Sequence, residues 1–122
     1  MTTIDKYLKL KEYIKSMEIR RLSEYRDKVI RLYTIAKDIL NDLSEKHGVV
    51  IIKCWEDNYG NKKDKYLVID DNEVFNGLIA LNNLYHLLII NSSRKYIKEQ
   101  FNKAKRAVLK LIDILIKDER ES

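Results

Sequence analysis

Residues 49–71 read VVIIKCWEDNYGNKKDKYLVIDD, and they decide the fold because no other part of the chain lacks a helical pattern. Both ends of this stretch are rich in β-branched and aromatic side chains, which fit a pleated strand and lose rotamer freedom in a helix. Its polar middle contains Asn58 and Gly60, which tolerate positive φ and are typical of turns. The stretch therefore predicts a β-hairpin with strands at about residues 49–56 and 65–70.

The residues before this stretch predict two helices. Apolar side chains recur every three or four residues from Tyr7 to Met17, which indicates a helix over residues 4–16. A second apolar series predicts a helix over residues 18–47, and the following Gly48 is a typical C-terminal signal. A step of five residues separates the two series. The first helix therefore either kinks near its end or continues with its apolar stripe rotated.

The second apolar series is long enough to form a coiled-coil-like seam. A helix over residues 18–47 would be about 45 Å long, which is more than a small domain needs. Long seams of this kind often meet a partner helix. We therefore expect an oligomer interface, most simply that of a dimer, at Leu22, Tyr25, Val29, Leu32, Ala36, Ile39 and Leu43.

Two further helices are predicted after the hairpin. Asp70 and Glu73 have the spacing of a capping box, which predicts a helix over residues 72–91. This helix is apolar on most sides, so we expect it to be the central buried helix that covers the hairpin. Ser93 can cap a last helix over residues 93–118. At this stage the last two helices can form either a helical hairpin or one bent helix.

These elements together predict the fold class. We expect a single domain over residues 1–122, of the mostly helical α+β class, with the order helix, helix, strand, strand, helix, helix. Long amphipathic helices would flank the central hairpin in a bundle-like dimer. A two-stranded hairpin is marginal in water by itself, so the helices or a second copy must cover it.

Several kinds of chemistry are excluded by what the sequence contains. The three glycines are isolated, so there is no phosphate-binding loop and no dinucleotide fingerprint. His47 and His86 have no acid or thiol partner at the spacing of metal ligands. Cys54 is the only cysteine, which excludes an internal disulfide. We therefore expect no enzyme activity, no catalytic residues, no cofactor and no metal.

The sequence also bears on location. It does not begin with a signal-peptide pattern, and its longest apolar run, residues 78–90, is shorter than the roughly 20 residues that cross a bilayer. We expect no membrane contact and a cytoplasmic location, or the interior of a host cell if the protein is viral. The usage rich in Ile, Lys, Asn and Tyr resembles proteins of AT-rich genomes, including archaea and their viruses.

Basic residues gather on the predicted last helix. The net charge is +5, and residues 94–110 hold seven basic side chains against the single acid Glu99. A basic face of this kind can bind phosphates by charge and counterion release, although Lys also commonly fills a solvated helix face. Candidate nucleic-acid-binding residues are Arg94, Lys95, Lys98, Lys103, Lys105, Arg106 and Lys110, with Lys62, Lys63 and Lys65 at the hairpin tip.

Two functional hypotheses follow. The first is a small non-enzymatic homo-oligomeric protein that acts by protein–protein recognition as a scaffold, adaptor or inhibitor. The alternative is a nucleic-acid-binding regulatory protein that uses the basic face of the last helix and the hairpin tip. A winged-helix arrangement fits less well, because the helix before the hairpin is too long for a recognition helix.

Overall fold

The computed structural model describes residues 2–53, 66–86 and 93–121. Its elements are α1 (Thr3–Ser16), the short 3-10 helix η1 (Leu22–Glu24), α2 (Tyr25–His47), β1 (Val49–Lys53), β2 (Tyr66–Asp70), α3 (Asn72–His86) and α4 (Arg94–Glu121). The mostly helical α+β class and the predicted order of elements are confirmed. Among the described residues, no helix is both long and apolar enough to cross a membrane.

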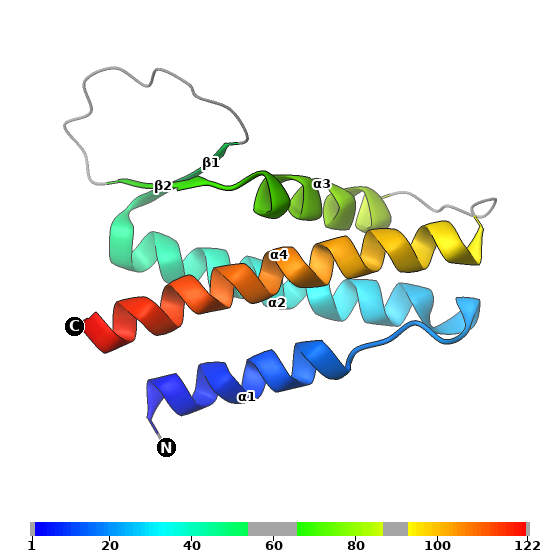
Figure 1. Cartoon of the computed structure of the whole chain (residues 1–122), viewed down its shortest axis with the longest axis horizontal. Helices are drawn as coiled ribbons and strands as arrows, with labels where there is room; N and C mark the ends of the chain where they lie inside the picture. Colours follow the sequence, from blue (N-terminus) through cyan, green and yellow to red (C-terminus); the bar gives the residue numbers. More distant parts are fainter. Residues whose placement is uncertain (1, 54–65, 87–92, 122) are drawn as a thin grey trace.

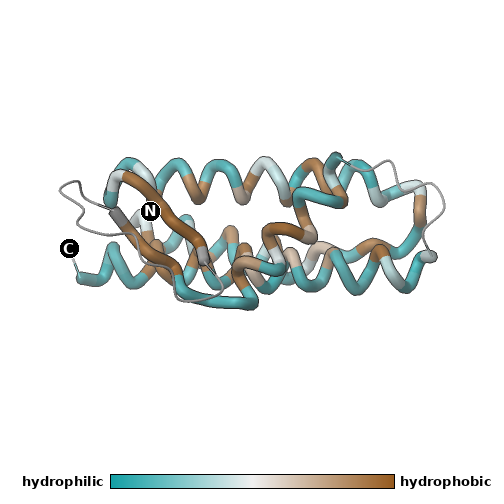
Figure 2. Tube along the Cα trace, turned by 90° about the horizontal axis from the view of Figure 1, so that it is seen from above, coloured by the Kyte–Doolittle hydropathy of each residue, from teal (hydrophilic) through white to brown (hydrophobic). Residues whose placement is uncertain are grey.

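The elements stack in three layers. Figure 1 shows α1 on one side, α2 and α4 in the middle, and the two strands with α3 on the other side. Figure 2, seen from above, shows this last layer lying over α2 and α4. The central helix is α4, which packs against α1, α2 and α3. Its buried side chains are Ile97, Phe101, Ala104, Ala107, Val108, Leu111, Ile112, Leu115 and Ile116.

The prediction that residues 72–91 form the central helix is therefore wrong. The helix α3 lies in an outer layer and covers α4 with Val74, Leu81 and Leu84. Its Ile79 is 44% exposed, on a side that no other described element covers. A helix that is apolar on most sides is expected to be buried by other elements on most sides. In this chain, the other elements bury only part of the surface of α3.

The two predicted strands form, but the predicted hairpin pairing is wrong. They pair in parallel, with Val49 opposite Tyr66 and Lys53 opposite Asp70. A parallel pair needs a crossover connection of about a dozen residues, and the twelve residues 54–65 are long enough for one. The β-branched composition identified the strands but could not indicate their direction. The predicted turn, the predicted strand ends beyond Lys53 and the loop lysines lie outside the described residues.

Local capping explains three of the helix ends. Thr2 and Asp5 form a capping box at the start of α1, with the Thr2 hydroxyl accepting from the Asp5 amide at 3.1 Å. Gly48 ends α2 with a φ of 81°, as predicted. The Ser93 hydroxyl accepts from the Tyr96 amide at 3.1 Å, which confirms the predicted cap of α4. The helix then continues to Glu121, beyond its predicted end.

One predicted helix start and one predicted cap residue differ in the structure. The predicted helix over residues 18–47 begins only at Tyr25, because the backbone at Met17 and Arg21 is extended. The five-residue step between the apolar series is thus a connection, and buried Met17 and Ile19 hold it against the core. The cap of α3 is Asp71 rather than the predicted Asp70. Its Oδ1 accepts from the backbone amides of the second and third residues after it, at 2.8 and 3.1 Å.

The last two helices form a helical hairpin rather than one bent helix. They run antiparallel, and Gly77 lets their backbones approach closely. A Cβ atom built on Gly77 would lie 2.4 Å from the Ala107 Cβ and 2.5 Å from the Lys103 carbonyl oxygen. The predicted helix over residues 72–91 is described as far as His86, and the rest lies outside the described residues.

Candidate recognition surfaces

Two of the predicted basic residues donate hydrogen bonds to backbone carbonyls between Lys15 and Arg20. Arg94 donates from its guanidinium to the Arg20 carbonyl. The Lys105 ammonium donates to the Met17 carbonyl at 2.6 Å and to the Lys15 carbonyl at 3.2 Å. Burial lowers the pKa of Lys105. Both side chains therefore fasten the connection between α1 and α2 onto α4, which is a structural role.

Two further basic residues face acids on α3. The Lys110 ammonium lies 2.9 Å from the Asp71 carboxylate and 3.8 Å from that of Glu73. This hydrogen bond raises the pKa of Lys110 and lowers the pKa of Asp71. The Arg106 Nε lies 3.7 Å from the Glu73 carboxylate. These cations are thus largely neutralised from within the chain.

Three other predicted cations on α4 have no acid partner among the described residues. Lys95, Lys98 and Lys103 form no ion pair with any other residue in the described ranges. Lys95 and Lys103 are exposed, and Lys98 is half-buried. The predicted hairpin-tip lysines Lys62, Lys63 and Lys65 lie outside the described residues. The basic face therefore offers fewer ammonium groups to a phosphate backbone than the sequence indicates.

A polar groove runs between α3 and α4. It encloses about 310 Å³, and Lys103 and Arg106 stand on its α4 side. Amide side chains of both helices line it, namely Asn76, Asn83 and Gln100. Gly77 and Ala80 contribute little side-chain volume to it. Glu73, which lies 3.7 Å from the Arg106 Nε, lines it as well. The groove therefore offers a ligand the Lys103 ammonium and amide donors, whereas Arg106 already faces an acid.

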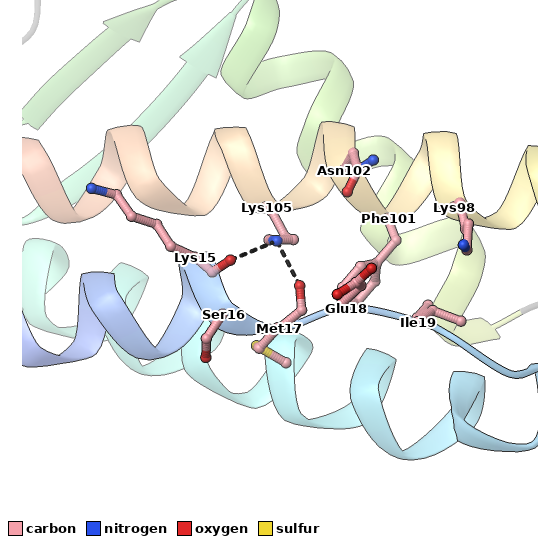
Figure 3. Close-up of a pocket in the computed structure, with 9 residues that line it drawn as sticks. All are labelled: Lys15, Ser16, Met17, Glu18, Ile19, Lys98, Phe101, Asn102 and Lys105. Carbon is pink, nitrogen blue, oxygen red and sulfur yellow. Dashed lines mark hydrogen bonds between the residues drawn. The ribbon is translucent and has the colours of Figure 1, made fainter.

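A second pocket lies between α4 and the segment that follows α1 (Figure 3). It encloses about 300 Å³, with Lys98, Asn102 and Lys105 contributed by α4. Glu18 is the only acid that lines it, and its carboxylate lies 3.4 Å from Arg20. The remaining lining residues are Lys15, Ser16, Met17, Ile19 and Phe101. We call it the α1–α4 pocket.

The outermost layer carries an apolar surface. Val50, Ile52, Leu67 and Ile69 pack against the core, so the alternate side chains of both strands face outward. Among the described side chains, this outward set consists of Val49, Ile51 and Val68, with the exposed acid Asp70 at the strand end. We call the three apolar side chains, together with the exposed Ile79 of the neighbouring helix α3, the outer apolar face. Val49 is 56% exposed, and Ile51 and Val68 are half-buried. Both strands are coloured as hydrophobic in Figure 2.

A shallow hollow adjoins this face. It encloses about 290 Å³ between β1 and α3, and apolar side chains supply most of its lining. The lining residues are Ile52, Phe75, Leu78, Ile79 and Asn82. Apolar side chains that gather at one surface are typical of protein contact sites.

The predicted seam lies inside the chain. Its buried members, all between 0 and 3% exposed, are Val29, Leu32, Ala36, Ile39 and Leu43. Tyr25 is half-buried and donates its hydroxyl hydrogen to the Leu84 carbonyl at 2.6 Å. Only Leu22, at 53% exposed, stands out from the surface. A second copy could reach this seam only if the bundle opened, so the exposed apolar surface lies elsewhere.

Other titratable residues have structural partners. The His47 Nε2 lies 2.7 Å from the Asp118 carboxylate, and Lys46 pairs with Glu119, so these contacts join the ends of α2 and α4. His86 makes an edge contact with the ring of Tyr85. In the described parts of the chain, no three His, Cys, Asp or Glu residues are placed to hold a metal. Cys54 falls outside those parts.

Sequence reasoning named the basic residues that line the groove and the α1–α4 pocket, but it missed the residues of the outer apolar face. The outward direction of Val49 and Ile79 depends on which faces other elements cover, and the local pattern does not contain that information. The α1–α4 pocket did leave a signal, because Lys98, Asn102 and Lys105 are spaced four and three residues apart and share one side of a helix. Comparison with protein-family models, curated proteins and solved structures finds no match to this chain.

Proposed function

We propose that this chain is a non-enzymatic protein that forms a homo-oligomer, most simply a dimer, and acts by protein–protein recognition as a scaffold, adaptor or inhibitor. The observation that supports this proposal is the outer apolar face. Parallel sheets normally have both faces covered, and two strands alone are marginally stable. In the described structure, the inner face of the sheet is covered and Val49 is 56% exposed.

A second copy of the chain is the occupant that suits this face. A two-fold interface uses the same patch on both partners, and an apolar patch is complementary to itself. Burying one Val or Ile side chain contributes about 1.5–3 kcal/mol, and every contact occurs twice in such an interface. A change at Val49 should therefore affect dimerisation twice over, which makes this residue a sensitive probe.

The test is the molar mass of the protein in solution, measured by light scattering after gel filtration across a range of concentrations. Wild type should be a dimer, and Val49→Lys should shift it to the monomer. The matched control is Leu8→Lys, because Leu8 is 40% exposed on α1, in the opposite outer layer. A wild type that is monomeric at every usable concentration contradicts the proposal. So does a Val49→Lys variant that dimerises as the wild type does.

A second candidate function is nucleic-acid binding along α4. The groove that contains Lys103 with three amide side chains favours it, as does the exposed Lys95, which pairs with no acid in the described ranges. Binding of labelled duplex DNA and single-stranded RNA should then weaken steeply with salt. The double variant Lys95→Glu and Lys103→Glu should abolish binding, while Lys9→Glu on α1 should change it little. Equal binding by both variants would remove α4 from the interface.

A further inference from the structure

The α1–α4 pocket contains a cation that is fixed in place. The Lys105 ammonium has three N–H donors, and two of them are directed at the Lys15 and Met17 carbonyls. These carbonyls belong to the last turn of α1 and to the residue that follows it. If Lys105 moved away, both carbonyls would lose their hydrogen-bond donor. The third N–H donor of Lys105 stays available to a ligand. Because burial lowers the pKa of this side chain, it has lost part of its hydration and gains by meeting an anion.

Two more donors line the pocket from the same helix. Lys98 lies seven residues before Lys105, and Asn102 lies between them, so the three side chains share one side of α4. Figure 3 shows Lys98 and Lys105 extending from α4 towards the segment that follows α1. Lys98 has no ion-pair partner in the described structure. Two ammonium groups and an amide thus lie around one cavity.

The acid content of the pocket is small. Glu18 is its only carboxylate, and its negative charge raises the pKa of Lys105 against the effect of burial. Glu18 is shared with Arg20 at 3.4 Å, and both side chains are largely exposed. It can therefore turn out to solvent at little cost. Lys15 directs its ammonium towards Glu12, at 3.5 Å, and away from the pocket.

The floor of the pocket limits what can bind. Phe101 is only 1% exposed, and Ile19 and Met17 are buried as well, so the floor offers almost no apolar surface to a ligand. A volume of about 300 Å³ accommodates a small oxyanion with its first waters. Recognition must then come from charge and N–H donors.

We propose that the α1–α4 pocket binds a phosphate group, held by Lys98, Asn102 and the remaining donor of Lys105, and that Glu18 is its internal competitor. A tetrahedral oxyanion has several oxygens that can each accept from a different donor, and the long side chain of Lys98 can turn towards Lys105 to reach it. The proposal is independent of the dimer, because the pocket is lined from α4 and the α1 segment, whereas the outer apolar face belongs to the strands and α3.

The experiment titrates the full-length protein with inorganic phosphate at constant ionic strength, and follows backbone amide chemical shifts. Saturable shifts should be confined to residues 15–19 and 98–105. Lys98→Gln should weaken binding about tenfold, as expected for the loss of a charge-assisted hydrogen bond. The matched control is Lys95→Gln, which removes the same charge from the same helix outside the pocket and should change binding less than about twofold.

A second pair of variants tests the competitor. Glu18→Gln should tighten phosphate binding, whereas Glu99→Gln makes the same change of charge on α4 outside the pocket and should have little effect. A parallel titration with adenosine monophosphate tests whether the bound phosphate group belongs to a nucleotide. Tighter binding of adenosine monophosphate than of inorganic phosphate would indicate that it does. The proposal is overturned if no saturable shifts appear at low salt. It is also overturned if Lys98→Gln and Lys95→Gln bind equally well.

Discussion

Substituting alanine for Gly77 tests the close approach of α3 and α4. In an open helix this change is stabilising, because alanine favours helix by about 1 kcal/mol over glycine. Here the new Cβ would lie 2.4 Å from the Ala107 Cβ and 2.5 Å from the Lys103 carbonyl oxygen. Neither contact can be relieved by rotating a side chain, because the obstacles are a carbonyl oxygen and a Cβ atom fixed to the α4 backbone. The two helices must therefore move apart.

The size of the effect follows from the two opposing contributions. Overpacking a core position typically costs about 1–3 kcal/mol, and separating the helices also loosens Val74, Leu81 and Leu84 against the core. Contacts of 2.4 and 2.5 Å place this change in the upper part of that range, about 2–3 kcal/mol. Since the gain in helix propensity offsets about 1 kcal/mol of this, we expect a net loss of about 1–2 kcal/mol in the free energy of unfolding. For a domain of this size, that corresponds to a fall of roughly 3–8 °C in Tm.

Urea denaturation followed by far-ultraviolet circular dichroism measures this loss. The matched control is Asn76→Ala, at an exposed neighbouring position of α3, where the gain in propensity should be seen without a packing cost. Ala107→Gly removes one of the two obstacles, so Gly77→Ala should cost less in that background than in wild type. A Gly77→Ala protein as stable as wild type, or more stable, would refute the close packing of α3 on α4.

Two further predictions concern the polar contacts that hold the ends of α1 and α3. The Lys110 ammonium lowers the pKa of Asp71, so its contribution to stability is complete above the usual value of 3.8 and is lost as the pH falls below it. Asp71→Ala should therefore cost about 1 kcal/mol at pH 7, and the urea midpoints of variant and wild type should draw together as the pH is lowered below the usual value of 3.8. Lys105→Met should leave the Lys15 and Met17 carbonyls without their donor, at a cost of about 1–3 kcal/mol. Hydrogen exchange should then speed up in the last turn of α1 while α3 is unchanged, and uniform exchange across both helices would contradict the assigned role of Lys105.

Sequence reasoning succeeded where the deciding contacts are local. The cap at Ser93 and the C-terminal Gly48 depend on hydrogen bonds or dihedral angles within four residues, so the pattern contains them. The direction of β2 against β1 depends on how each strand packs on helices that are distant in the sequence, and no composition rule specifies it. The helix α3 begins at residue 72 as predicted, but its cap is Asp71 rather than Asp70, and Asp71 is also favoured by Lys110, which lies 39 residues away.

The basic face shows the same limit for the candidate site. The spacing correctly predicted that Lys95 and Lys103 stand on the exposed side of α4. It could not predict that Arg94 meets a carbonyl of the α1–α2 connection, or that Arg106 and Lys110 meet acids at the start of α3. A count of charges on one helix therefore overstates the charge that is available to a ligand.

The sequence predicted α3 as the central helix, whereas the structure has α4 in that place. This difference has a physical cause. The helix α4 is strongly two-sided, and its wide apolar stripe meets α1, α2 and α3 while Lys95, Lys103 and Lys117 face solvent. The helix α3 is apolar on more of its circumference but has neighbours on only part of it, so Ile79 is left at the surface. Such a helix in an outer layer has more apolar surface than its own chain covers. The apolar residues around α3 suggested from the sequence that it is the central helix. In the structure, part of this apolar surface stays uncovered, and that uncovered part supports the proposed dimer.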